Sequence, residues 1–151
     1  MKVRVDDLTD PGVAEFLREH LEDMAQHSPP ESVHVLDLER LRKPDITFWT
    51  AWDKGELLGT GALKELDPRH GEIKSMRTAT GHRKQGVAST ILTVILKEAK
   101  RRNYTRVSLE TGSPAAFMPA RSLYAKFGFR ECGPFDGYAD DPYSVFMTKE
   151  L

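Results

Sequence analysis

Apolar and polar residues recur along this chain with two periods, one typical of helices and one typical of strands. The clearest helix begins at Val87 and ends near Asn103. Its apolar residues recur at helical spacing: Val87, Ile91, Val94, Ile95 and Ala99. Short runs of aromatic and β-branched residues, such as ITFWTAWD at residues 46–53, predict strands instead. The chain is therefore expected to mix both kinds of element.

Proline, glycine and charged breaks separate the predicted elements. The strands are predicted at residues 3–5, 46–53, 57–66, 72–78, 105–111, 129–133 and 143–150. The helices are predicted at residues 11–26, 36–41, 87–103 and 119–128, the first preceded by the N-cap residue Asp10. The order βααβββαβαββ predicts a mixed α/β fold, and the length fits a single domain over residues 1–151.

Composition narrows the class of protein. The chain is 39% hydrophobic and 30% charged, which is typical of a globular protein, and its net charge of −1 argues against a nucleic-acid or membrane-surface binder. No apolar run approaches the roughly 20 residues that span a bilayer, and the start MKVRVDD is not that of a signal peptide. The single cysteine, Cys132, fits a reducing compartment. We expect a cytoplasmic protein.

The segment TGHRKQGVAS at residues 80–89 joins a predicted strand to the clearest helix. A helix start offers free backbone N–H groups and the positive end of the helix dipole, both of which favour an anion. Gly86 would let the backbone approach a phosphate closely, and Arg83 and Lys84 would add positive charge. The phosphate-loop motif GxxxxGK[ST] fails because Val87 follows Gly86, and GxGxxG is absent. The segment predicts a pyrophosphate site of another kind.

Residues 83–88 resemble the [RQ]-x-x-G-x-[GA] signature of the GCN5-related N-acetyltransferases, the GNAT family. In that family a strand precedes the signature and a long helix follows it, and a later helix ends in L-Y-x-x-x-G-F. Here that motif stands at residues 123–129 as LYAKFGF. The resemblance implies a mixed, mostly antiparallel sheet of six to seven strands flanked by helices. Many members carry an asparagine where this chain has Phe117, so a coenzyme contact by that amide is not expected here.

The resemblance also implies acetyl-coenzyme A as co-substrate and an amine as acceptor. It places the coenzyme's pyrophosphate on Arg83, Lys84, Gln85, Gly86, Val87, Ala88 and Ser89. It places the pantetheine arm on the backbone of Met76, Arg77 and Thr78, and the hydroxyl of Tyr124 near the coenzyme sulfur, where it would act as the acid. Direct attack in a ternary complex is expected, because Cys132 has no evident activating base for an acyl intermediate.

Glu72 is the candidate general base. It stands at the same separation from the signature as the base of histone-acetylating members, and strand alternation predicts that it shares a face with Lys74, Met76 and Thr78. Desolvation would raise its pKa, whereas Lys74 would lower it. A structural or water-ordering carboxylate, or an ion pair with Lys74, is the alternative interpretation.

Other polar residues give weaker signals. His20, His27 and His34 recur every seven residues, but Pro29 and Pro30 interrupt the helix that would align them, so no metal is implied. Ser108 and Ser113 lack a nucleophile elbow. The acidic residues Asp136, Asp140 and Asp141 form a solvated loop or attract a cationic amine.

Two function hypotheses remain at this point. The first is an N-acetyltransferase acting on a primary amine of a small molecule or a protein. The second is a coenzyme-binding sensor or partner-binding domain without turnover, against which the retention of Tyr124 argues. Dimers are common in the family, so a homodimer is a further expectation.

Overall fold

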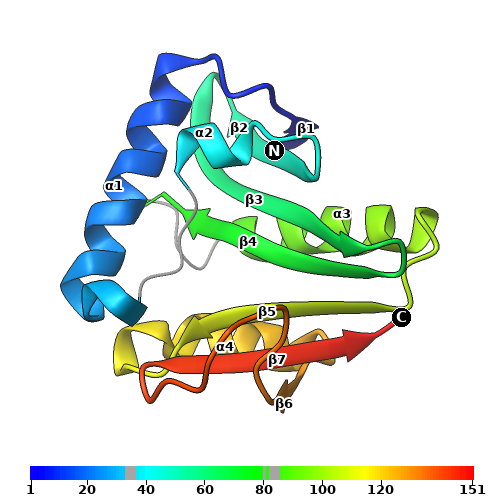
Figure 1. Ribbon diagram of the computed structural model, residues 1–151. Coiled ribbons are helices and arrows are strands. Elements are labelled where there is room, and N and C mark those ends of the chain that lie inside the picture. The colour runs from blue at the N-terminus through cyan, green and yellow to red at the C-terminus, as the bar shows by residue number, and fades with distance from the viewer. Residues whose placement is uncertain (33–36, 80, 82–85) are drawn as a thin grey trace.

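A seven-stranded sheet forms the centre of the computed structural model, which describes residues 1–32, 37–79, 81 and 86–151. Its strands are β1 (Lys2–Val5), β2 (Ile46–Asp53), β3 (Glu56–Asp67), β4 (His70–Thr78), β5 (Arg106–Gly112), β6 (Arg130–Cys132) and β7 (Ser144–Glu150). The α-helices are α1 (Pro11–His27), α2 (Leu38–Leu41), α3 (Val87–Arg101) and α4 (Met118–Lys126), and η1 (Pro30–Ser32) and η3 (Ala115–Phe117) are 3-10 turns. The predicted mixed α/β class and the predicted order of elements are confirmed (Figure 1).

The first helix shows how local sequence sets an element's bounds. The Asp10 side chain accepts a 2.7 Å hydrogen bond from the backbone N–H of Gly12, and Pro11 occupies the first turn. The helix ends at His27, before two prolines. Its apolar stripe, Val13, Phe16 and Leu17, is buried. The start of the predicted second helix, at Leu36, falls outside the described residues.

The strands lie in the order β1-β2-β3-β4-β5-β7-β6. All neighbouring pairs are antiparallel except β4 and β5, which run parallel and are joined through α3. Parallel neighbours need such a crossover, because a tight hairpin can join only antiparallel strands. The mostly antiparallel sheet agrees with the fold that the family resemblance implies.

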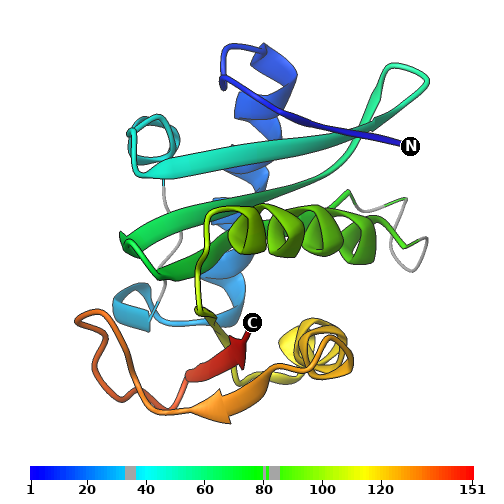
Figure 2. The same ribbon diagram turned by 90° about the vertical axis from the view of Figure 1, so that its right-hand side faces the viewer.

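The helices divide between the two faces of the sheet. The helices α3 and α4 lie behind the sheet in the view of Figure 1. Their buried side chains, including Ile91, Ile95 and Tyr124, pack in one core cluster. Side chains of α1 and α2, including Val13 and Leu41, form a second cluster on the opposite face. We call these the α3 face and the α1 face. Figure 2 shows the segment between β6 and β7 on the opposite side of the sheet from α4, which places it on the α1 face.

A bulge at Ser75 divides β4 into two halves. Ala62 pairs with Lys74 whereas Thr60 pairs with Arg77, so β4 holds one extra residue here. Ser75 adopts a positive φ of 56°, and its carbonyl accepts a 2.8 Å hydrogen bond from the Thr60 hydroxyl. The inserted residue reverses the side-chain alternation beyond it.

The prediction that Glu72, Lys74, Met76 and Thr78 share one face is therefore wrong beyond Lys74. Met76 packs into the core under α3, and a Cβ on Gly61 would lie 2.8 Å from its sulfur. Arg77 turns to the α1 face instead, where its guanidinium lies over the ring of Phe16.

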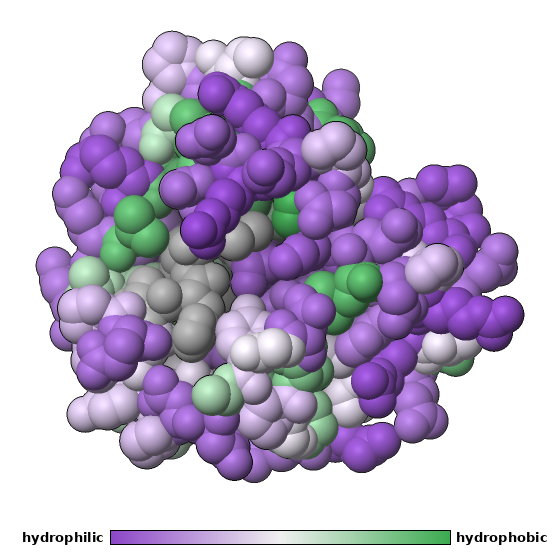
Figure 3. Space-filling view, in the orientation of Figure 1, coloured by the Kyte–Doolittle hydropathy of each residue, from purple (hydrophilic) through white to green (hydrophobic). Residues whose placement is uncertain are grey.

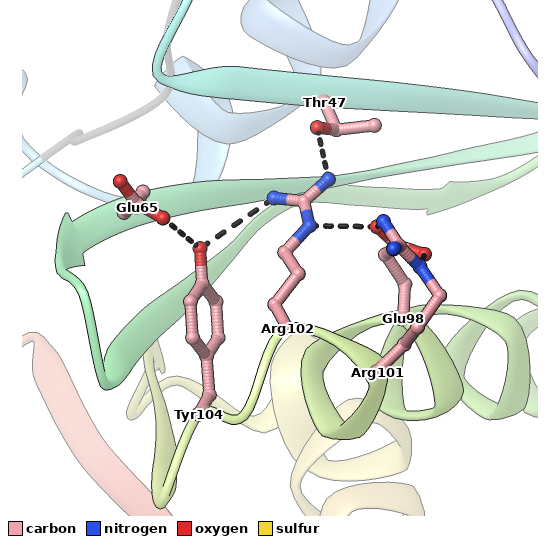
Figure 4. A network of polar contacts seen from close by, with 6 residues as sticks. All are labelled: Thr47, Glu65, Glu98, Arg101, Arg102 and Tyr104. Atoms are coloured by element: carbon pink, nitrogen blue, oxygen red, sulfur yellow. Dashed lines mark hydrogen bonds and ion pairs between the residues drawn. The ribbon is translucent and has the colours of Figure 1, made fainter.

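A polar network fixes the carboxyl end of α3 to the sheet (Figure 4). Arg102 donates hydrogen bonds of 2.7 Å to the hydroxyl of Thr47 in β2 and to Glu98 in α3. Tyr104 donates a 2.7 Å bond to Glu65 of β3. These contacts set the direction of α3, whose opposite end carries the predicted pyrophosphate site.

The surface seen from the side of Figure 1 is mainly hydrophilic among its described residues (Figure 3). Hydrophobic residues form small separate groups there, without a broad apolar patch. Obligate partners usually bury such a patch. The predicted homodimer stays a prediction.

Candidate active site

The start of α3 has the features of an anion site. Gly86 is its N-cap, with a left-handed φ of 78°, and the first turn holds no acidic residue. The Thr90 N–H makes the first helical bond, to the Gly86 carbonyl. The N–H groups of Val87, Ala88 and Ser89 therefore have no acceptor within the helix. Among the other predicted pyrophosphate ligands, Arg83, Lys84 and Gln85 lie outside the described residues.

The strands β4 and β5 part immediately beside this helix start. They pair only from His70 with Arg106 to Ile73 with Leu109. Beyond that point β4 continues along β3 and β5 continues along β7, and the two strands diverge in Figure 1. The backbone of Met76, Arg77 and Thr78 borders this split, as the family resemblance implies for residues that bind the pantetheine arm.

Glu72 lies below the split and is buried. Its side chain is 2% exposed, and its Oε2 accepts a 3.1 Å bond from Lys74 Nζ and a 2.7 Å bond from the Tyr138 hydroxyl. Lys74 also donates to Tyr138 at 2.8 Å. Burial and the Glu72 charge raise the pKa of Tyr138, which keeps that hydroxyl a donor. The ion pair with Lys74, which the alternative interpretation expects, is therefore present.

Glu110 is a second carboxylate, which the sequence reasoning missed. It follows Leu109, the last residue of β5 that pairs with β4, and it is partly buried. Desolvation raises the pKa of Glu110 to about 7, while the adjacent Ser144 hydroxyl and Lys74 oppose that rise. A carboxylate in a central strand was the available signal, because central strands rarely bury a charge without a partner or a function.

Tyr124 is the buried residue of α4 and lies on the α3 face of the sheet. Its ring packs edge-on against Phe129, with 5.8 Å between the ring centres. Burial raises the pKa of Tyr124 and the Glu110 charge raises it further, so the phenol keeps its proton at neutral pH. The Glu110 charge thus acts on the Tyr124 phenol.

Phe117, which stands where many members of the resembled family carry an asparagine, has a defined packing site. A Cβ on Gly112 would lie 2.3 Å from the Phe117 ring, so only glycine leaves room for the ring at that strand position. The ring also contacts His27 edge-on, with 6.0 Å between the ring centres. Phe117 thus joins β5 to the end of α1.

The α1 face of the split is bordered by α1 and by the segment between β6 and β7. Arg77 donates a 3.0 Å bond to Asp23 and contacts His20, which is buried. Burial and the Arg77 charge lower the pKa of His20 to about 4, so its ring is neutral. Asp141 accepts a hydrogen bond from Ser32 of η1, which ties the two borders together.

The weaker candidates take other roles. Burial raises the pKa of the Cys132 thiol, which lies on β6. Ser108 is buried and hydrogen-bonded to His70 at 2.7 Å and to Thr148 at 2.9 Å. Within residues 1–32, 37–79, 81 and 86–151, no three His, Cys, Asp or Glu side chains gather as a metal site. His34 of the predicted histidine repeat is outside those ranges.

Comparison with known proteins identifies the family. Residues 13–129 match the sequence profile described as the acetyltransferase (GNAT) family. The chain belongs to this family. It is 58% identical to an uncharacterized N-acetyltransferase of Bacillus subtilis, YsnE, over the full length of both chains. It is 49% identical to another from Escherichia coli, YedL, over 99% of this chain and 94% of that one.

Solved structures show the same fold. An aminoglycoside 6'-N-acetyltransferase complexed with coenzyme A superposes with a TM-score of 0.71 at 16% identity, over 99% of this chain and 97% of that chain.

The described part of this chain holds no helix that is both long and apolar enough to cross a membrane.

Proposed function

We propose that this protein transfers an acetyl group from acetyl-coenzyme A to a primary amine, by direct attack in a complex that holds both substrates. The observation that carries the proposal is the parting of β4 and β5 directly beside the glycine-capped start of α3. A split in a sheet exposes backbone groups to a ligand, and a helix start attracts its phosphates.

The coenzyme would extend from the start of α3 into the split between β4 and β5. Its pyrophosphate would bind at Gly86, Val87, Ala88 and Ser89, with Arg83, Lys84 and Gln85 completing the site. Its pantetheine arm would pair with the backbone of Met76–Thr78 and bring the thioester into the split. The aminoglycoside acetyltransferase of the same fold was solved with coenzyme A, which supports this use of the fold.

The reaction has four requirements: a neutral amine, a thioester held at attack distance, donors for the oxyanion, and a proton for the thiolate. A backbone N–H near Met76 would stabilise the oxyanion. Tyr124 would protonate the departing thiolate, because its raised pKa keeps the phenol protonated until that step. Cys132 would take no part, since its raised pKa disfavours the thiolate form.

The proton acceptor has two candidates, Glu72 and Glu110, which differ in access. The acceptor amine would approach from the α1 face, where Asp141 and the neighbouring acidic residues Asp136 and Asp140 favour a cation.

The net charge of −1 and the single cysteine support a cytoplasmic enzyme that does not bind nucleic acid.

A panel of amines tests this function. Purified protein is mixed with acetyl-coenzyme A and, in turn, polyamines, amino acids, aminoglycosides and lysine-containing peptides. Thiol release and the mass of each amine are then measured. We expect release together with one acetyl group on at least one amine. Coenzyme binding by calorimetry without transfer to any amine would favour the alternative, a coenzyme-binding sensor.

A further inference from the structure

We propose that Glu110, and not Glu72, takes the proton from the acceptor amine. This inference rests on the proposed function and adds the group that the sequence did not indicate.

The first step is position. Ile73 and Leu109 form the last pair between β4 and β5. Glu110 is therefore the first residue of β5 in the region where the two strands have parted. The side chain of Ser108 lies on the α1 face, where it contacts His70 and Thr148, and that of Leu109 lies in the core on the α3 face. Strand alternation then places Glu110 on the α1 face. Glu110 therefore borders the split on the side from which the acceptor would enter.

The second step is the surroundings of Glu110. The charged and titratable groups that interact electrostatically with Glu110 are Lys74 and Glu72 of β4, Asp141 and Tyr138 of the segment before β7, and Tyr124 of α4. The Ser144 hydroxyl on β7 also lies beside it and is buried without a hydrogen bond of regular geometry to any described residue. Desolvation dominates among these influences and moves the pKa of Glu110 to about 7, where a base is half ionised at neutral pH.

The third step is the contrast with Glu72. Glu72 is fully buried and accepts two hydrogen bonds, one from Tyr138 and one from Lys74. An amine would have to displace both donors to reach it, and it would leave the Lys74 ammonium buried without its partner. Glu110 has no ion-pair partner within 4.0 Å among the described residues, so its carboxylate is available to a substrate.

The proton balance of the reaction is then complete. The neutral amine attacks the thioester carbon, the N–C bond forms, and one amine proton passes to the Glu110 carboxylate. The C–S bond breaks, and the thiolate takes the proton of Tyr124. Glu110 releases its proton to solvent, from which Tyr124 regains one. The products are the amide and the free coenzyme thiol.

The test compares Glu110→Gln, Glu110→Asp and Glu72→Gln, with Glu150→Gln as the control for loss of an exposed carboxylate. The substrate is an amine that the wild-type protein acetylates in the panel. The readouts are kcat against pH, coenzyme affinity by calorimetry, and the carboxyl titration of ¹³C-labelled glutamate followed by NMR.

We expect Glu110→Gln to lower kcat on the order of 10²-fold and to flatten the acidic limb of the profile, with coenzyme affinity unchanged. Glu110→Asp should retain part of that limb. A carboxyl signal that titrates near neutrality should be present in the wild type and in Glu72→Gln, and absent from Glu110→Gln.

Three results would overturn the inference. One is a Glu110→Gln variant whose kcat falls in acid as that of the wild type does. Another is a Glu72→Gln variant that loses this acidic limb of the kcat profile while Glu110→Gln keeps it. The third is the absence of any carboxyl that titrates near neutrality. A wild-type protein that acetylates no amine would instead refute the proposed function, and the role of Glu110 with it. These failures are distinguishable. The two kinetic results can be obtained only with an active wild type, and the carboxyl titration needs no substrate.

Discussion

The hydroxyl of Tyr138 donates a 2.7 Å hydrogen bond to the Glu72 carboxylate, although the two residues lie 66 positions apart. This bond fastens the segment between β6 and β7 onto β4. The ring of Tyr138 also packs against Phe135 and Phe146, with 5.2 and 5.5 Å between the ring centres. The segment that borders the acceptor side is thus held by a buried carboxylate, and Glu72 has a structural task.

Coenzyme affinity should depend on Gly86. Gly86→Asp places a carboxylate where a phosphate would bind and forces a side chain into a left-handed backbone. We expect coenzyme affinity to fall more than about 100-fold by calorimetry, which corresponds to roughly 3 kcal/mol.

Gly55 provides the matched control for that variant. Its φ is 79°, and like Gly86 it has open space where a Cβ would stand, but it lies in the turn between β2 and β3. Gly55→Asp carries the same strain and charge and should leave coenzyme affinity unchanged. Equal losses in both variants would show that the effect is on folding and not on an anion site.

Turnover should depend on the Tyr124 hydroxyl more than coenzyme binding does. A proton donor to the leaving thiolate acts in the transition state, so Tyr124→Phe should lower kcat by about 10- to 100-fold with little change in coenzyme affinity. Tyr143→Phe, at an exposed tyrosine, is the control. A Tyr124→Phe variant with wild-type kcat would reduce Tyr124 to a packing residue.

Removal of the Glu110 charge and removal of the Glu72 charge should change the free energy of unfolding in opposite directions. The pKa of Glu110 is raised, so its contribution to stability is fully present below the ordinary glutamate pKa and is lost as pH rises through about 7. Glu110→Gln should therefore be more stable than the wild type at alkaline pH, by on the order of 3 kcal/mol, and similar at acidic pH.

Glu72→Gln should destabilise the protein, because it leaves the buried Lys74 ammonium without a carboxylate, at a cost of about 3 kcal/mol. Urea denaturation of both variants at acidic and alkaline pH measures these changes. A gain in stability for Glu72→Gln would contradict the structural task assigned to Glu72.

The contact between α1 and β4 should weaken in acid through His20. Burial and the Arg77 charge lower the pKa of His20 to about 4. The neutral ring therefore contributes stability above the ordinary histidine pKa, and this contribution is lost as the pH falls from that ordinary pKa through about 4. His20→Gln removes this titration. Between neutrality and acid pH, wild-type stability should fall by about 3 kcal/mol more than that of the variant, as denaturant titrations can measure. Parallel pH curves would contradict the assignment.

The sequence predicted those parts of the fold that follow from local periodicity and breaks. The helix from Val87 was clear because its buried stripe recurs at helical spacing, and the order of elements followed from glycine and proline between the runs. The start of that helix also carried the family signature, so the coenzyme side of the site could be proposed before the structure was known.

The acceptor side could not be predicted in the same way, because it depends on contacts between distant residues. The bulge at Ser75 inserts one residue into β4, which strict alternation cannot foresee, so Met76 and Thr78 were assigned to the wrong face. The position of Glu110 becomes informative only when β4 and β5 are seen to part after Leu109. Nothing local links Tyr138 to Glu72, and a single sequence contains no record of their pairing.

The central claim is that coenzyme A lies in the split between β4 and β5 with its pyrophosphate at the start of α3. Amide NMR of ¹⁵N-labelled protein, titrated with coenzyme A, tests it directly. We expect the largest shifts at Met76, Arg77, Thr78 and the amides of residues 86–89. A separate hollow of about 510 Å³, lined by residues that include Val5, Thr47 and Val94, lies between the edge of the sheet and α3. Shifts confined to that hollow, with the amides of the split unchanged, would contradict the account.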